Sequence, residues 1–253
     1  MILDQFSLKG RVAIVTGASR GLGQGMAVGL AEAGADVVAV GSSAQVHETA
    51  KQIAALGRQC LPIQADLISQ APIAGIVSDT LKKFGKIDIL VNCAGIIRRA
   101  PALEFSEKDW DDVININQKT VFFMSQAVAK EMVKQKKGKI INIASLLTFQ
   151  GGIIVPSYTA SKSAVGGLTK ALANEWAPLG LNVNGIAPGY MATEMTSALQ
   201  SDANRAPAIL SRIPQGRWGT PEDMKGAAVY LASDASNYLQ GHIITVDGGW
   251  MGR

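Results

Sequence analysis

The stretch VAIVTGASRGLG, residues 12–23, decides the fold, because it joins a short strand to a glycine-rich turn and then to a helix. Its first residues are apolar or β-branched, which favours a buried strand. Gly17, Gly21 and Gly23 occupy the turn, and a stretch rich in Ala and Gly follows. Glycines let the backbone approach a phosphate closely, and a helix N-terminus directs free N–H groups toward it. The stretch predicts a nucleotide phosphate site, although the literal GxGxxG spacing is absent.

The rest of the chain repeats this alternation of short apolar runs and longer helical patterns. Such a pattern is typical of βαβ units, whose right-handed crossovers place helices on both faces of a parallel sheet. The predicted fold class is therefore α/β, a Rossmann-type doubly wound seven-stranded parallel sheet in one domain, residues 1–253. The least regular stretch, residues 190–219, is expected to be a substrate lid. Strands are expected at 12–16, 36–40, 61–66, 87–92, 139–145, 181–188 and 242–248.

Composition excludes several classes of protein. With 47% hydrophobic and 17% charged residues, the chain has ample side chains for a large core. It shows neither a secretory leader nor an apolar run long enough to span a membrane, so a cytoplasmic protein is expected. The net charge is +4, but the basic residues are scattered without interleaved aromatics, which argues against nucleic acid. Cys60 and Cys93 lie in unrelated contexts, so no disulfide framework and no metal site are expected.

Further cofactor contacts are predicted where other strands end, because ligands bind at the carboxyl edge of open α/β sheets. Asp66 could accept a hydrogen bond from an adenine amino group, and Thr193 lies within reach of a carboxamide. The expected cofactor-binding residues are Gly17, Ser19, Arg20, Gly21, Leu22, Gly23, Ser42, Asp66, Leu67, Asn92, Ala94, Gly95, Tyr158, Lys162, Pro188, Gly189, Met191 and Thr193.

The end of the second strand bears on the choice between NAD and NADP. An acidic residue there would bond the ribose hydroxyls of NAD and repel the extra phosphate of NADP. This chain has Gly41, Ser42 and Ser43 instead, and Arg20 in the glycine turn could pair with a phosphate. These residues favour NADP, while an exposed loop arginine is an equal alternative for Arg20.

The motif YTASK supplies the predicted chemistry. Tyr158 and Lys162 are four residues apart, so on a helix they share one face. An ammonium beside a phenol favours the phenolate and would lower the pKa of the tyrosine from its ordinary value of about 10. Ser145 closes the fifth strand and can hydrogen-bond a substrate oxygen. Asn117 lies in what reads as one long, largely apolar helix, where its amide needs a partner and could hold a water beside Lys162.

Taken together, these motifs resemble the short-chain dehydrogenase/reductase family over essentially the whole chain. The resemblance implies an NAD(P)-dependent oxidoreductase in which the tyrosine is the general acid/base and the lysine binds the nicotinamide ribose and lowers the tyrosine pKa. The serine orients the substrate, and the asparagine sustains a water-linked proton relay. By position these catalytic roles fall on Tyr158, Lys162, Ser145 and Asn117. Cys93 stands where the family usually has an asparagine, which puts one strand-end hydrogen bond in doubt.

Segments such as IIRRAPALEFSEKDWDDV and IAPGYMAT are similar to those of family members that act on sugar acids. This closer resemblance implies a substrate from hexuronate breakdown, reduced or oxidised at C5, and it favours NAD. A carboxylate substrate needs cationic or donor-rich partners, although each arginine could equally serve in surface pairing. The candidate substrate-binding residues are Ser145, Arg98, Arg99, Gln150 and Arg217.

Two other functions stay open on sequence alone. The fatty-acid reductases that act on a β-ketoacyl thioester have a similar glycine turn, but they need a basic patch for an acidic carrier protein. A nucleotide-sensing regulator could keep the fold without chemistry, although retention of all four catalytic residues argues against it. The family resemblance also implies a homotetramer with the helices around 107–135 and 158–177 at interfaces.

Overall fold

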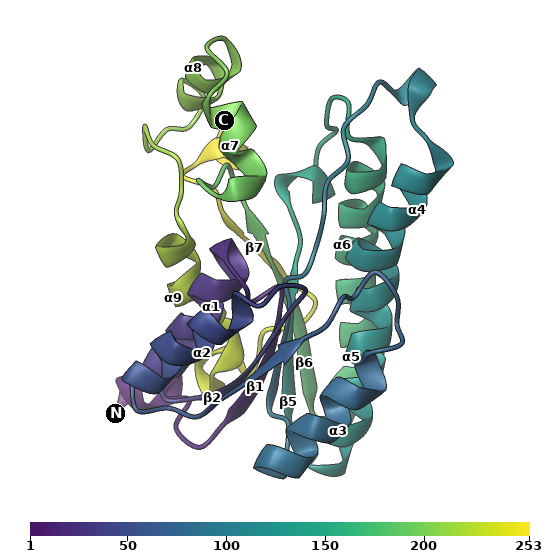
Figure 1. Ribbon diagram of the computed structural model, residues 1–253. Coiled ribbons are helices and arrows are strands. Elements are labelled where there is room, and N and C mark those ends of the chain that lie inside the picture. Colours follow the sequence, from purple (N-terminus) through teal and green to yellow (C-terminus); the bar gives the residue numbers. More distant parts are fainter.

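The computed structural model describes residues 1–253 and contains one seven-stranded sheet (Figure 1). The strand order is β3-β2-β1-β4-β5-β6-β7, and every pair is parallel. The predicted fold class is therefore confirmed. The strands are β1 (Val12–Thr16), β2 (Asp36–Gly41), β3 (Cys60–Gln64), β4 (Ile89–Asn92), β5 (Gly138–Ile143), β6 (Leu181–Pro188) and β7 (Ile243–Val246).

Helices cover both faces of the sheet (Figure 1). One face carries α1 (Gly21–Glu32), α2 (Val46–Ala55) and α9 (Pro221–Ala232), and the other carries α3 (Ile73–Phe84), α4 (Glu107–Ile114), α5 (Thr120–Lys134) and α6 (Pro156–Trp176). The short helices α7 (Ser197–Gln200) and α8 (Arg205–Leu210) lie above the carboxyl ends of the strands. None of the helices combines the length and the apolar character that crossing a bilayer requires.

Two large apolar cores hold these layers together. Successive side chains of a strand point to opposite faces. Accordingly Ala13 and Val15 of β1 belong to the core under α1 and α9, whereas Ile14 belongs to the core under α3, α5 and α6. All three are fully buried. The continuous apolar runs that predicted strands thus reflect burial on both faces of the sheet.

One predicted element is wrong in detail. The expected continuous helix around Asn117 is divided into α4 and α5 by a π-helical turn over Asn115–Lys119. Such turns insert one residue into a helix and occur often at functional sites. Periodicity does not reveal this insertion, because the apolar positions on either side still match helical spacing.

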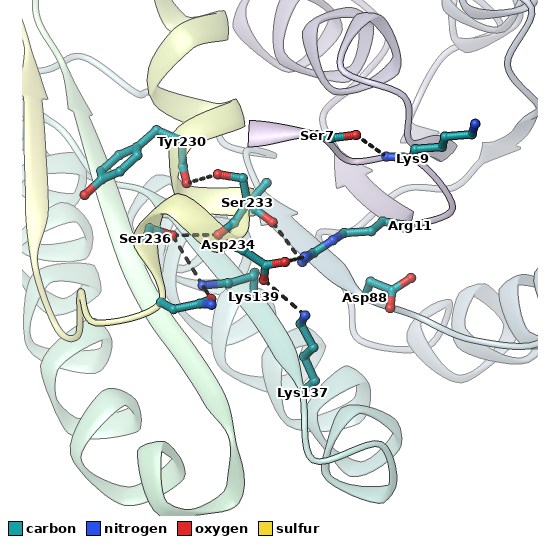
Figure 2. Close-up of polar contacts among 12 residues, drawn as sticks. Ser7, Lys9, Arg11, Asp88, Lys137, Lys139, Tyr230, Ser233, Asp234 and Ser236 are labelled. Atoms are coloured by element: carbon teal, nitrogen blue, oxygen red, sulfur yellow. Dashed lines mark hydrogen bonds and ion pairs between the residues drawn. The ribbon is translucent and has the colours of Figure 1, made fainter. Parts of the chain in front are cut away.

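A polar cluster ties the sheet to the end of α9 on the edge opposite the glycine turn (Figure 2). The ammonium of Lys139 is buried in β5, 2.9 Å from Asn237 Oδ1 and 3.3 Å from Ser236 Oγ. Burial lowers the pKa of Lys139 to about 8. Arg11 and Lys137 both point at Asp234, with N···O distances of 2.6 and 3.0 Å.

Asp234→Asn is expected to lower the free energy of unfolding at pH 7 by about 1 kcal/mol, because the ion pairs are partly exposed and screened by solvent. Burial by itself would raise the pKa of Asp234, but hydrogen bonds from Arg11 and Lys137 outweigh it and hold the pKa at about 2. This stabilisation is present above the ordinary value of 3.8 and is lost as the pH falls toward 2. Urea unfolding measured across that interval should show a steeper loss for the wild type than for the variant.

Glu48→Gln removes an exposed ion pair with Lys51 and is the matched control, expected to change stability little. Parallel acid profiles for wild type and Asp234→Asn would contradict the stabilising role of Asp234.

Candidate active site

A cleft of about 910 Å³ opens at the carboxyl ends of the strands. The sheet order reverses between β1 and β4, and ligands of open α/β sheets bind where this reversal occurs. Thr16, the last residue of β1, fixes the two strands at this point. Its hydroxyl accepts hydrogen bonds from the backbone N–H groups of Cys93 and Ala94, at 3.0 and 3.1 Å.

The glycine turn forms one wall of the cleft. Gly17 has a φ of 68°, and a Cβ there would lie 2.9 Å from the Ala94 backbone. A Cβ on Gly23 would lie 2.2 Å from the carbonyl oxygen of Gly17, so only glycine fits at that position. Ser19 lines the cleft beside them, and its Oγ is buried without a hydrogen-bond partner in the protein. A compact backbone cradle with an orphaned hydroxyl fits a phosphate.

Three side chains with reactive groups meet in the cleft: Ser145 after β5, and Tyr158 and Lys162 on α6. The Lys162 ammonium is buried, donates to the Ile143 carbonyl at 2.6 Å, and lies 5.6 Å from the centre of the Tyr158 ring. The Ser145 side chain lies close enough to Tyr158 to influence its pKa. The expected placement of tyrosine and lysine on one helix face is thereby confirmed.

The predicted lowering of the Tyr158 pKa is wrong, because the pKa is raised in the folded chain. Burial raises the pKa of Tyr158 and outweighs the influence of Ser145, which lowers it. Burial also lowers the pKa of Lys162 to about 8, because an apolar surrounding disfavours the ammonium. The prediction counted the attraction between ammonium and phenolate but not the desolvation of both groups.

Comparison with known proteins shows the family of the chain. A family model described as short chain dehydrogenase matches residues 11–204. The chain belongs to the short-chain dehydrogenase family. It is 59% identical, over the full length of both chains, to 2-dehydro-3-deoxy-D-gluconate 5-dehydrogenase of Dickeya dadantii (strain 3937). It is 45% identical to gluconate 5-dehydrogenase of Gluconobacter oxydans (strain 621H), over 97% of this chain and 96% of the relative.

A solved structure extends the comparison to three dimensions. The gluconate 5-dehydrogenase of Burkholderia cenocepacia J2315, crystallised in complex with NADP and tartrate, has a TM-score of 0.94. Its identity to this chain is 39%, and the match covers 100% of each chain.

In this short-chain dehydrogenase, every residue predicted to contact the cofactor lines the cleft, with the exception of Asn92. Asn92 is buried in the sheet, where its amide donates to Ser125 Oγ and Asn142 Oδ1, each at 2.9 Å. It closes β4 as expected, but its side chain points into a polar network between strand and helix. The prediction for Asn92 is therefore corrected, since a strand-end position alone does not say which way a side chain points.

Asn117 lies next to the cleft in the π-helical turn and is fully buried. Its Oδ1 accepts from the Ile96 backbone N–H, and its Nδ2 donates to the Ile96 carbonyl and to Ser161 Oγ, at 2.9, 2.9 and 3.2 Å. The amide thus finds its partners within the protein. The contacts fix the backbone that follows β4.

Two predicted substrate contacts lie elsewhere in this dehydrogenase. Arg217 makes a two-pronged pair with Asp223 at 2.7 Å and lines a separate cavity of about 110 Å³. Gln150 contacts the chain terminus, accepting from Trp250 Nε1 at 3.4 Å. Neither lines the cleft and each is held by other protein groups, so both predictions are corrected. The sequence positions of Arg217 and Gln150 do not reveal that Asp223 and Trp250 are their partners.

Arg98 and Arg99 are adjacent in the sequence but differ in their partners. Arg98 lines the cleft but pairs with Asp109 and Asp112, at 3.2 and 3.6 Å. Arg99 lies outside the cleft lining, but it is exposed and has no carboxylate partner. Its guanidinium makes only a long contact of 3.5 Å to the Met195 carbonyl. Its charge reaches Tyr158, where it acts to lower the pKa against the dominant effect of burial.

Some cleft residues gave no signal in the sequence. Ile96, Ile97 and Ile116 supply an apolar wall, and such isoleucines cannot be distinguished from core residues by sequence pattern. Glu194, directly after Thr193, also lines the cleft and pairs with Arg20 at 2.6 Å. An acidic residue on the expected lid was the available clue.

Proposed function

We propose that this protein is an NADP-dependent oxidoreductase that interconverts a ketone and a secondary alcohol at C5 of a sugar acid, with 2-dehydro-3-deoxy-D-gluconate as the first candidate. The convergence of Ser145, Tyr158 and Lys162 at the cleft beside the glycine turn carries the proposal. A 59% identical relative named for that activity supports the choice of substrate.

The residues of the cleft fit a dinucleotide. The glycine turn and the orphaned Ser19 hydroxyl would hold the pyrophosphate, and Asp66 would face the adenine. Arg20 and Ser42 would hold the extra phosphate of NADP, because no carboxylate follows β2 to repel it. NADP in the Burkholderia relative supports this preference over NAD. The cofactor supplies or accepts the hydride.

The chain's own residues handle the proton. Tyr158 donates a proton from its hydroxyl to the carbonyl oxygen during reduction and accepts one during oxidation. Ser145 hydrogen-bonds the same oxygen and holds it against the tyrosine. Lys162 places its ammonium beside the Tyr158 ring and would donate a hydrogen bond to a ribose hydroxyl of the cofactor. Asn117 positions the backbone beside Lys162 through Ile96.

Arg99 is the arginine that we propose binds the substrate carboxylate. Arg98 and Arg217 are each neutralised by aspartates, whereas Arg99 has no such partner and lies close enough to influence Tyr158. A free guanidinium can bind a carboxylate through two parallel hydrogen bonds. Gluconate is the second candidate substrate, supported by the Gluconobacter relative and sharing the same carboxylate.

Arg99→Gln is expected to raise KM for the sugar acid about 10- to 100-fold with a small change in kcat, because a hydrogen bond to a charged group contributes roughly 1.5–3 kcal/mol. KM for an uncharged alcohol of similar size should change less than twofold. Steady-state kinetics on both substrates provides the comparison.

Arg98→Gln is the matched control, expected to raise KM much less because its guanidinium already pairs with two aspartates. Equal losses on the acid and the uncharged substrate would remove Arg99 as the carboxylate ligand.

We further propose one domain with residues 190–219 acting as the substrate lid, a cytoplasmic location and a homotetramer. Trp110 and Phe123 leave apolar surface exposed on α4 and α5, which supports contacts between copies. Assays of purified protein against a panel of keto sugar acids, with both cofactors, test the function. Turnover of β-ketoacyl thioesters alone would overturn the substrate assignment.

A further inference from the structure

The beginning of the proposed lid lies beside the glycine turn. A Cβ on Gly21 would lie 3.7 Å from Thr193 Cγ2, which is ordinary van der Waals contact. The neighbouring residues form an ion pair, with Arg20 Nη1 2.6 Å from Glu194 Oε2. An ion pair therefore joins the proposed lid to the glycine turn at a point where both line the cleft.

Glu194 is one of two acidic side chains that line the cleft, with Asp66 as the other. The two carboxylates have different partners. Asp66 Oδ1 accepts from the Ile68 backbone N–H at 3.0 Å, which fixes it in a local turn. Glu194 pairs with no residue other than Arg20, so its charge is directed at the guanidinium expected to receive the 2′-phosphate.

We infer that Glu194 sets the cofactor preference by competing with the 2′-phosphate of NADP for Arg20. This inference rests on the proposed use of a dinucleotide by this site. A phosphate on Arg20 and a carboxylate in the same place repel each other, so the ion pair must loosen before the phosphate can bind. NAD has no phosphate at this position and leaves the pair intact. The Glu194 carboxylate therefore weakens the binding of NADP but not of NAD. It narrows the preference of the site for NADP over NAD.

Both side chains are more than half exposed, at 61% and 65%, so the effect is moderate. Exposed ion pairs are weak and screened by solvent. Glu194→Gln keeps the size and polarity of the side chain and removes its charge. The dissociation constant for NADPH is expected to fall by about three- to tenfold, and that for NADH to change by less than twofold.

The test is a fluorescence titration of the intact protein with NADPH and with NADH. Four proteins are compared: wild type, Glu194→Gln, Arg20→Gln, and the double variant. Arg20→Gln should weaken NADPH selectively, and adding Glu194→Gln to it should then have no further effect. Glu222→Gln is the charge-matched control, because Glu222 is exposed on α9 and pairs with Lys225 away from the cleft.

Unchanged or weaker NADPH binding in Glu194→Gln would overturn the inference. So would equal tightening of both cofactors, or a gain that persists without Arg20, because each would show an effect of overall charge or lid packing. The expected binding pattern without sugar-acid turnover would leave the inference in place and overturn the proposed substrate. Failure of the wild type to bind either dinucleotide would overturn both.

Discussion

Tyr158→Phe is expected to reduce kcat by at least about 10³-fold in either direction, while the dissociation constants for both cofactors change less than threefold. The variant keeps the ring that packs beside Lys162 and removes only the hydroxyl that transfers the proton. General acid–base catalysis typically contributes 10²–10⁴-fold, and 10³-fold corresponds to about 4 kcal/mol. Steady-state kinetics together with cofactor titration separates the chemical step from binding.

Tyr238→Phe is the matched control, because the Tyr238 side chain is fully exposed and remote from the cleft. Its kcat should equal that of the wild type. If Tyr158→Phe kept a tenth or more of the wild-type kcat, Tyr158 could not be the proton donor.

Lys162→Met is expected to lower kcat by about 10²- to 10³-fold and to move the alkaline limb of the reduction profile to higher pH. Loss of the ammonium removes a positive charge beside the phenol, so the pKa of Tyr158, already raised by burial, rises further. Reduction requires the protonated tyrosine, and the rate therefore falls only at higher pH in the variant. The pH dependence of kcat/KM for reduction measures this displacement.

In the wild type the reduction rate is expected to begin to decline near pH 8, because burial lowers the pKa of Lys162 to about that value and a neutral lysine no longer places a positive charge beside the tyrosine. Lys170→Met, on the exposed face of the same helix, should leave the profile unchanged. An unshifted alkaline limb in Lys162→Met would show that the lysine does not control the ionisation of the tyrosine.

The strands could be predicted because their signal is local. Residues 12–16 and 181–188 match β1 and β6 to the residue, and each run is buried along its whole length. The predicted start at residue 87 was too early for β4, which begins at Ile89. The Asp88 side chain accepts from the Val12 backbone N–H at 2.8 Å, an arrangement outside the regular sheet pairing.

Two segments of the candidate site could also be predicted, because each is defined by residues close together in the sequence. The glycine turn and the YTASK segment each place their residues by spacing alone. The ion pairs of Arg20 and Arg98 join segments that are distant or separately folded, so no spacing rule reveals them. The orientation of Asn92 and the π-helical turn at Asn117 depend on packing between helix and sheet, which the sequence pattern does not encode.

The pKa of Tyr158 could not be predicted from the sequence for a different reason. Sequence places a lysine near the phenol, but the balance between attraction and desolvation depends on how deeply both groups are buried. Burial dominates for Tyr158 and for Lys162 in the folded chain. A cationic nicotinamide, when bound, adds a second positive charge that favours the phenolate.

The most direct test follows the absorbance of reduced nicotinamide while purified protein is mixed with 2-dehydro-3-deoxy-D-gluconate and NADP. One reduced nicotinamide should form for each C5 hydroxyl oxidised, and the same reaction should run in reverse from the ketone. Absence of turnover with this acid and with gluconate, using either cofactor and with cofactor binding intact, would contradict the account.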